Sequence, residues 1–347
     1  MGREVPGVIL IVVGPEGIRA RSTVGMADLT SGTRMATDMA IPWFSMTKIA
    51  TATAAVRLAE NDGFELDGLA SPLVPAMHAL RPEEWVERIT IRHLLQHAAG
   101  LANPIPVKWI HPADQPGPDP EAFLEELLRK HARLRFEPGE KSSYSNLSTL
   151  ILGAAISRVA GHPYEEVARE QVLEPLGMSS TGFAYDPALV AATGYHPRRS
   201  LMRVFLPRWV TGWASGRWIG FRRFILDGAP YGGLIGTAED AVRFLQMHLR
   251  NGELEGARVL SPESAELMRT ITLQGRRFDL GLGWFVPGDQ RTAEPVFVEH
   301  LGGGAGFFNV LRMYPSQRVG AVVMGNSTKY DIDAIARLAL EFGDVSP

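Results

Sequence analysis

The sequence predicts an α/β (α+β) protein in which an antiparallel sheet is flanked by helices and built from both ends of the chain. Runs of apolar and β-branched residues occur near both termini, over residues 7–25 and again after about residue 278. Between them the apolar residues recur mainly at helical spacing. We therefore expect a mainly helical domain inserted between two sheet segments.

The N-terminal segments predict a hairpin followed by a buried helix. Residues 7–13 and 18–25 suit strands, and the Gly-Pro-Glu-Gly segment between them has the composition of a tight turn. Residues 45–60 are rich in alanine with apolar residues at helical spacing, and an Asn-Asp-Gly segment ends them. Ser45 is thus predicted at the N-terminus of a helix.

The middle of the chain contains four further helix starts, each with its own capping residue. These residues are Asp119, Ser145, Thr237 and Ser261. Two stretches interrupt the helical pattern: a proline-rich loop over residues 103–120 and an insertion-like, tryptophan-rich segment over residues 195–232. We expect both to form walls rather than core.

The C-terminal part alternates β-type runs with Gly and Pro and ends in a helical run over residues 331–342. The predicted domains are therefore a sheet domain of residues 1–62 and 281–347 and a mainly helical domain of residues 63–280, with a lid-like segment at 195–232. A cleft is expected where the domains meet.

Composition excludes several classes of function. The chain has 347 residues, a net charge of −3 and no cysteine, which disfavours nucleic-acid binding and excludes disulfides and thiolate catalysis. The apolar run Val8 to Val13 is short for a signal-peptide core, so a cytoplasmic location is favoured, unless a targeting segment has been removed. Membrane contact is not expected, and the oligomeric state is left open.

Ser45 and Lys48 form the first candidate catalytic pair. They are three residues apart at a predicted helix start, so their side chains share one face. A serine hydroxyl needs a neighbouring base, and a desolvated lysine can serve; a lysine that stays charged can instead lower the pKa of a nearby phenol. A capping serine followed by an unrelated surface lysine is the plainer alternative.

Two more motifs follow in the order that such chemistry needs. Tyr144 and Asn146 are alternate residues before an apolar helix, where a phenol and an amide can project together. Residues 300–306 form the glycine-rich segment HLGGGAG after a strand, where the backbone N–H of Gly303 can point at an oxyanion. Taken alone, the first motif is better explained as a helix cap with a packed aromatic residue and the second as a flexible turn between strands.

Together these segments resemble the serine β-lactamase and penicillin-binding-protein superfamily, in its class C β-lactamase, DD-peptidase and family VIII carboxylesterase branch. The resemblance extends from about Pro6 to Met324, nearly the whole chain. The segments that carry it are FSMTKIATATAAVRLAENDG, ITIRHLLQHAAGL, FEPGEKSSYSNLSTLILGAAI, LEPLGMSSTGF, YGGLIGTAEDAVRFL and EHLGGGAGF. The resemblance implies the β-lactamase/transpeptidase-like fold.

The resemblance also implies a role for each motif residue. Ser45 would be the acylated nucleophile, with Lys48 and Tyr144 as its proton-transfer partners, and Asn146 would contact the substrate. The N–H groups of Ser45 and Gly303 would form the oxyanion hole.

The third motif departs from the family pattern. His300 stands where class C enzymes carry a lysine, before Leu301 and Gly302. The loss of that cation, and of the hydroxyl that follows it, predicts a weaker grip on a β-lactam carboxylate.

Other readings remain open. No Gly-x-Ser-x-Gly elbow is present, which disfavours a classical α/β-hydrolase. His93 and His97, four residues apart, could bind a metal or simply pack and cap; we expect no metal or other cofactor. Trp209, Trp213 and Trp218 are predicted to line a lid over an apolar substrate group, with structural packing or membrane contact as alternatives.

We therefore predict a serine hydrolase that acts through an acyl-enzyme on a small-molecule ester or amide. A carboxylesterase for small or medium acyl esters is the leading hypothesis. The alternatives are a β-lactamase, a D-Ala-D-Ala carboxypeptidase or D-aminopeptidase-type amide hydrolase, and a non-enzymatic sensor or scaffold of the penicillin-binding type.

Overall fold

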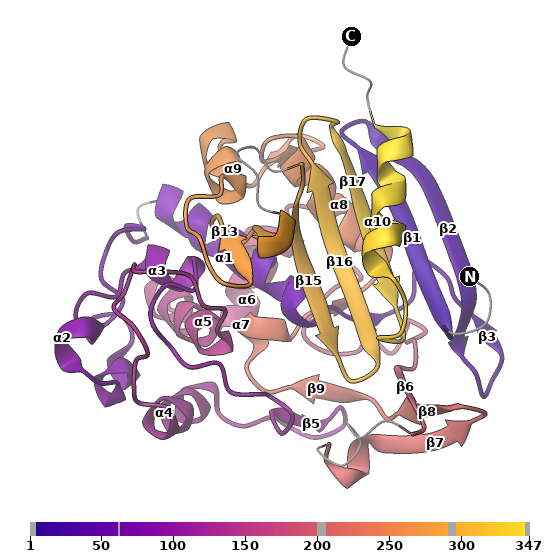
Figure 1. Cartoon of the computed structure of the whole chain (residues 1–347), viewed down its shortest axis with the longest axis horizontal. Helices are drawn as coiled ribbons and strands as arrows, with labels where there is room; N and C mark the ends of the chain where they lie inside the picture. Colours follow the sequence, from indigo (N-terminus) through magenta and orange to yellow (C-terminus); the bar gives the residue numbers. More distant parts are fainter. Residues whose placement is uncertain (1–4, 62, 200–205, 291–295, 344–347) are drawn as a thin grey trace.

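The chain is described by a computed structural model that covers residues 5–61, 63–199, 206–290 and 296–343. Its centre is an eight-stranded antiparallel sheet in the order β13-β14-β15-β16-β17-β1-β2-β3 (Figure 1). The bounds of these strands are β1 (Gly7–Gly14), β2 (Gly17–Asp28), β3 (Thr33–Arg34), β13 (Phe278–Leu280), β14 (Phe285–Pro287), β15 (Val298–Gly304), β16 (Phe307–Tyr314) and β17 (Val319–Gly325). The N-terminal hairpin thus pairs with the C-terminal strands, which confirms the predicted fold class.

Burial explains the order of the strands. β1 and β17 pair from Val8 opposite Gly325 to Val13 opposite Gly320. Both strands are apolar along nearly their whole length, as central strands covered on both faces must be. β2 is largely exposed and carries Arg19 and Arg21, which suits a strand near the sheet edge.

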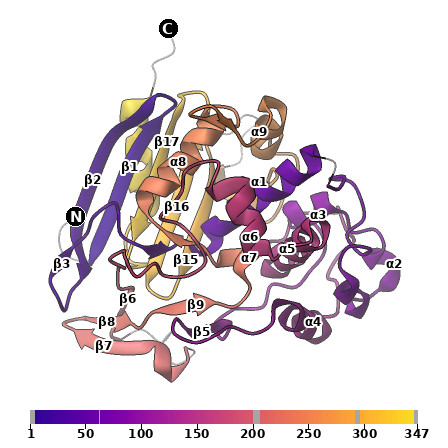
Figure 2. The same cartoon turned by 180° about the vertical axis from the view of Figure 1, so that it is seen from behind.

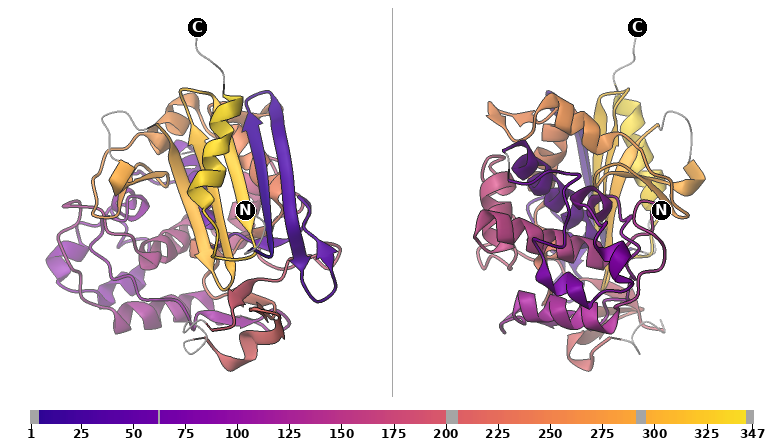
Figure 3. Two further views of the ribbon diagram at one scale, coloured as in Figure 1. Left: turned by 45° about the vertical axis from the view of Figure 1, so that its right-hand side comes forward. Right: turned by 90° about the vertical axis from the view of Figure 1, so that its left-hand side faces the viewer.

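Helices cover both faces of the sheet, which gives three layers. α8 (Ala238–Leu249) packs against β1 and β17 on one face (Figure 2). α10 (Ile332–Arg337), followed by the 3₁₀ turn η7 (Leu338–Phe342), covers β16 and β17 on the other (Figure 3). A small apolar cluster that includes Val12, Val310 and Ile332 fills the second interface.

The remaining helices form the other half of the molecule, beside β15 (Figure 1). Asp119, Ser145, Thr237 and Ser261 each accept a hydrogen bond from a backbone N–H three residues on, so the four predicted caps are confirmed. The helices are α1 (Thr47–Glu60), α2 (Glu83–Val86), α3 (Ile91–Leu95), α4 (Pro120–Lys130), α5 (Asn146–Ala160), α6 (Tyr164–Ala168), α7 (Ala229–Gly232) and α9 (Pro262–Arg269), with 3₁₀ turns η1 (Phe44–Met46), η2 (Pro75–Ala79), η5 (Arg208–Val210) and η6 (Gly288–Gln290) and a π turn η3 (Arg169–Leu173).

The remaining strands form short pairs and one three-stranded sheet outside the main sheet. They are β4 (Ile41–Pro42) with β10 (Ile235–Gly236), β5 (Ile110–Pro112) with β9 (Phe224–Leu226), β11 (Glu253–Leu254) with β12 (Ala257–Arg258), and β8 (Trp218–Phe221) between β6 (Tyr195–Pro197) and β7 (Thr211–Ser215). The β5–β9 pair links the proline-rich loop to the tryptophan-rich segment. Residues 200–205 of that segment lie outside the described residues.

The division at residues 62 and 281 stays a prediction. α8, which belongs to the predicted helical domain, packs on the sheet, so the two halves share a large interface. Within the described ranges, no helix combines the length and apolar character needed to cross a bilayer.

Candidate active site

Ser45 lies in a tight turn and not in the helix proper. The sequence places it at a helix N-terminus, but α1 begins at Thr47 and Ser45 occupies η1 just before it. Phe44 has φ of 51°, a conformation that bulky residues rarely adopt. Its ring packs between those of Phe224 and Phe307, at centroid distances of 6.2 and 6.1 Å. This packing holds the turn and leaves Ser45 half-buried at the head of α1.

The glycine-rich end of β15 lies directly against this turn. A Cβ atom on Gly302 would lie 2.0 Å from the carbonyl oxygen of Trp43 and 3.0 Å from the backbone nitrogen of Met46. Only glycine fits there, because the two backbones are in van der Waals contact. The predicted third motif is thus next to Ser45, and Gly303 follows in the same strand.

Lys48 is the immediate partner of Ser45. Its Nζ donates hydrogen bonds to Ser45 Oγ at 3.0 Å and to the backbone carbonyl of Tyr231 at 2.6 Å. The side chain is buried, and burial lowers the pKa of Lys48 well below its usual range. A neutral amine that can accept the Ser45 proton is therefore accessible.

Tyr144 completes the predicted group of three. Lys48 Nζ lies 5.1 Å from the centroid of its ring, and the Ser45 side chain is close enough to its phenol for a hydrogen bond. Burial raises the pKa of Tyr144, and the bond from Ser45 and the charge of Arg277 offset only part of that rise. The phenol consequently stays protonated at neutral pH and is a proton donor before it is a base.

The His97 ring packs against the Tyr144 ring, a contact that sequence reasoning missed. The two rings lie 4.6 Å apart, and His97 Nδ1 accepts a hydrogen bond from the backbone N–H of Ser145 at 3.4 Å. Burial, and after it the charge of Lys48, lower the pKa of His97 well below its usual range. His93 caps α3 instead, where its Nδ1 accepts from the backbone N–H of Thr90. These contacts match the packing and capping alternative for the two histidines.

The His300 side chain lies near Lys48 and is neutral at pH 7. Its Nδ1 donates to the Leu301 carbonyl at 3.0 Å, and its ring packs 4.9 Å from that of Phe285. Burial and the nearby Lys48 lower the pKa of His300 to about 3. The position at which class C enzymes carry a lysine is therefore occupied by an uncharged side chain in this protein.

Asn146 is the first residue of α5, and its side-chain oxygen is an unsatisfied hydrogen-bond acceptor. Its backbone N–H donates to Asn103 Oδ1 at 3.1 Å. Its own Oδ1 is buried and has no hydrogen-bond partner among the described residues. A buried amide oxygen without a partner is costly, so this atom is available to a ligand or to a neighbouring donor.

The three candidate tryptophans are directed elsewhere. Trp209 packs on the main core, Trp218 is buried on β8, and the Trp213 indole N–H donates to Thr30 Oγ1 beside the β2–β3 turn. None of the contacts named here is with Ser45, Lys48 or Tyr144. Their predicted place over the substrate thus remains a hypothesis.

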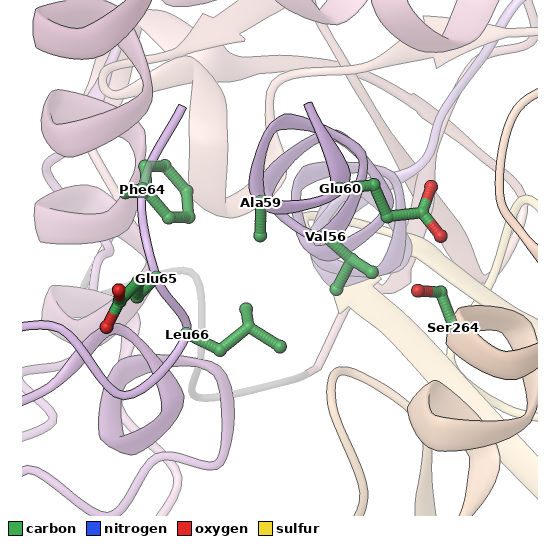
Figure 4. A pocket seen from close by; sticks show the side chains of 7 residues that line it. All are labelled: Val56, Ala59, Glu60, Phe64, Glu65, Leu66 and Ser264. Atoms are coloured by element: carbon green, nitrogen blue, oxygen red, sulfur yellow. The ribbon is translucent and has the colours of Figure 1, made fainter. Parts of the chain in front are cut away.

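A hollow of about 510 Å³ lies at the opposite end of α1 from Ser45 (Figure 4). It is lined by Val56, Ala59, Glu60, Phe64, Glu65, Leu66 and Ser264. A helix of this length separates it from the Ser45 turn by about 20 Å, so it is not part of the candidate site.

Comparison with known proteins shows the family to which the chain belongs. Residues 1–342 match the family described as Beta-lactamase. Esterase EstB of Burkholderia gladioli is 30% identical over 263 residues, which cover 70% of this chain and 66% of EstB. The D-alanyl-D-alanine-carboxypeptidase/endopeptidase AmpH of Escherichia coli is 25% identical over 336 residues, which cover 93% of this chain and 80% of AmpH.

A solved structure shows the same fold. The octameric penicillin-binding protein homologue from Pyrococcus abyssi superposes with a TM-score of 0.80 at 23% identity, and the match covers 98% of this chain and 74% of that chain. The chain therefore belongs to the beta-lactamase family, within the superfamily of serine hydrolases that includes the penicillin-binding proteins.

Proposed function

We propose that this protein is a carboxylesterase that acts through an acyl-enzyme on Ser45. One observation carries the proposal: Lys48 Nζ lies 3.0 Å from Ser45 Oγ, buried, and its pKa is lowered by desolvation. A buried amine beside a hydroxyl at the head of a helix is the arrangement that activates a serine nucleophile. Family membership supports hydrolysis, and the likeness to EstB supports an ester substrate.

The proposed reaction has two steps. Lys48 takes the proton of Ser45 while Oγ attacks the ester carbonyl, and the backbone N–H groups of Ser45 and Gly303 stabilise the oxyanion. Tyr144 then donates its proton to the departing alcohol oxygen and regains one from the Lys48 ammonium. Water repeats the sequence on the acyl-enzyme, which releases the acid and restores Ser45. Asn146 contacts the substrate acyl group in this scheme.

Specificity is proposed from the third motif. A neutral His300 and the apolar Leu301 provide neither the cation nor the hydroxyl that would hold a carboxylate, which favours an uncharged ester over a β-lactam or a peptide C-terminus. The likeness to AmpH keeps D-Ala-D-Ala peptide hydrolysis as the second candidate. We retain Trp209, Trp213 and Trp218 as part of a proposed lid.

The test is hydrolysis of a short-chain p-nitrophenyl ester together with covalent labelling by a fluorophosphonate. We expect turnover and labelling in the wild type, and neither in Ser45→Ala, whose circular dichroism should be unchanged. The values of kcat/KM for the aryl ester, nitrocefin and a D-Ala-D-Ala peptide then rank the substrates. Dominance by nitrocefin or the peptide would reverse our ranking, and a wild type without turnover or labelling would support a sensor or scaffold instead.

A further inference from the structure

The two predicted walls, residues 103–120 and 195–232, are joined by a buried acid and imidazole pair. β5 and β9 run antiparallel, with His111 opposite Ile225. Just after β9, Asp227 Oδ1 lies 2.6 Å from His111 Nδ1, and the two side chains are only 11% and 17% exposed. Burial raises the pKa of Asp227, and the hydrogen bond from His111 offsets part of that rise. A carboxyl this far from water needs such a donor.

The same wall is fastened to Tyr231 through Trp109. The backbone N–H of Asp227 donates to the Trp109 carbonyl at 2.9 Å. Asp227 is therefore bonded to the β5 segment twice, through its side chain to His111 and through its backbone to Trp109. The Trp109 ring in turn meets Tyr231 edge to face at 5.6 Å. Next to Asp227, Gly228 adopts φ of 88° and turns the chain into α7, which carries Tyr231.

α7 presents two carbonyl groups to α1. The Tyr231 carbonyl accepts from Lys48 Nζ at 2.6 Å, and the Pro230 carbonyl accepts from Thr51 Oγ1 at 2.7 Å. Thr51 also exchanges a hydrogen bond of 2.6 Å with the Tyr164 hydroxyl. A continuous series of contacts therefore runs from His111 through Asp227 and Tyr231 to the amine beside Ser45.

We propose that His111 and Asp227 are positioning residues for the reaction: their hydrogen bond fixes the wall so that the Tyr231 carbonyl stays on Lys48 Nζ. This inference rests on the proposed function. An error of about 1 Å in such a group is enough to cost catalysis, because the Lys48 amine has to stay aligned with the Ser45 hydroxyl.

The Tyr231 carbonyl matters because Lys48 has few acceptors. The charged or titratable groups that face it are Ser45 from its own turn, Tyr144, the Tyr231 phenol, His97 and His300. The described residues place no carboxylate among them. The Tyr231 carbonyl, at 2.6 Å, is closer to Lys48 Nζ than Ser45 Oγ is at 3.0 Å, so its displacement should disfavour the ammonium and lower the pKa of Lys48 further.

The experiment compares two substitutions at one position on the full-length enzyme. His111→Phe keeps a ring but removes the donor, and we expect kcat for a p-nitrophenyl ester to fall about tenfold with KM changed less than about threefold. The acidic limb of the kcat/KM profile should move to lower pH. His111→Asn, whose amide can still donate to Asp227, should recover most of kcat and the normal pH limb.

A matched control is available on the surface. His162 lies 3.9 Å from Glu166, with both side chains more than half exposed, and His162→Phe should leave kcat and the pH profile unchanged. Asp227→Ser breaks the buried hydrogen bond from the other side and should reproduce the losses of His111→Phe, which covers the case that His111→Phe fails to fold.

Three results would overturn the inference. The first is a normal kcat in both His111→Phe and Asp227→Ser. The second is a loss of rate with an unmoved pH limb and no recovery in His111→Asn, which would indicate a purely structural pair. The third is a wild type without turnover or Ser45 labelling, which overturns the proposed function as well; in the first two cases the wild type is active and that function stands.

Discussion

The two faces of β15 differ in whether their buried ionisable groups have partners of opposite charge. Glu299 and His300 are consecutive residues, so the pleat directs their side chains to opposite faces of the sheet. Both are almost completely buried. On the α10 side, Glu299 forms an ion pair with an arginine. On the α1 side, His300 lies near other basic groups and has no acidic partner among the described residues.

On the α10 face, an arginine has two acidic partners. Arg312 donates to Glu299 at 2.6 and 2.9 Å and to Asp333 at 2.8 Å, and its guanidinium lies 4.1 Å from the Phe297 ring centroid. Although burial alone would lower the pKa of Arg312, the Glu299 carboxylate keeps it above its usual value. Burial raises the pKa of Glu299, and the charge and hydrogen bonds of Arg312 offset part of that rise, so each buried ion on this face has a partner of opposite charge.

On the α1 face, Lys48, His97 and His300 gather without a carboxylate among the groups described. Burial lowers the pKa of each of them. A group of buried bases held in their neutral forms is a costly arrangement for stability, and it is what proton transfer needs. Buried ionisable groups are thus paired with opposite charges on the α10 face, whereas on the α1 face three of them lie beside Ser45 without such partners in the described part of the chain.

The largest effect should come from breaking the ion pair on the α10 face. Arg312→Met leaves Glu299 buried without its partner, which should lower the free energy of unfolding by about 3–5 kcal/mol. Urea denaturation measures this loss. Because the pair lies on the far face from Ser45, kcat for an aryl ester should change less than about twofold below the unfolding transition.

The double variant Arg312→Met/Glu299→Gln sharpens this prediction. Removing both charges should recover part of the lost stability, since no uncompensated ion then remains buried. A single variant that keeps full stability, or a double variant that is worse than the single, would show that the two faces do not differ in this way.

The second effect falls on activity and not on stability. Tyr144→Phe removes the phenol that returns the proton, so kcat should fall by about 10² or more, equivalent to about 2.7 kcal/mol. The melting temperature should stay the same or rise, because a buried hydroxyl is lost from an apolar setting. A variant with a near-normal rate would remove Tyr144 from the mechanism.

Much of the fold and of the candidate site was within reach of the sequence. The apolar runs at both ends, the four capping residues and the ordered motifs around Ser45, Tyr144 and His300 predicted the fold class correctly and brought the candidate catalytic residues together. Those features are local: a cap, a turn and a strand period each depend on a few neighbouring residues.

The supporting contacts could not be predicted, because they depend on backbone positions far apart in the chain. The Tyr231 carbonyl on Lys48 is a main-chain atom whose position no side chain indicates, and the glycine at position 302 did not indicate that Trp43 would be its neighbour. The strained Phe44 turn replaced a predicted helix start for the same reason, since rings from β9 and β16 hold it. His111 and Asp227 are 116 residues apart and gave no motif.

The smallest effect is expected from restoring a cation on the α1 face. His300→Lys places an ammonium where the resembling lactamases have one, so the ratio of kcat/KM for nitrocefin to that for a neutral aryl ester should rise about tenfold, or about 1.4 kcal/mol. The rate on the ester should fall, because a second buried amine disfavours protonation of Lys48 during acylation.

His300→Gln is the matched control, since it changes size and hydrogen bonding but adds no charge, and the substrate ratio should stay within about twofold of the wild type. If His300→Lys also leaves the ratio unchanged while the enzyme remains folded, the missing cation does not set substrate preference. The choice between ester and β-lactam would then depend on the walls built by β5 and β9, and the unmatched bases of the α1 face would serve proton transfer alone.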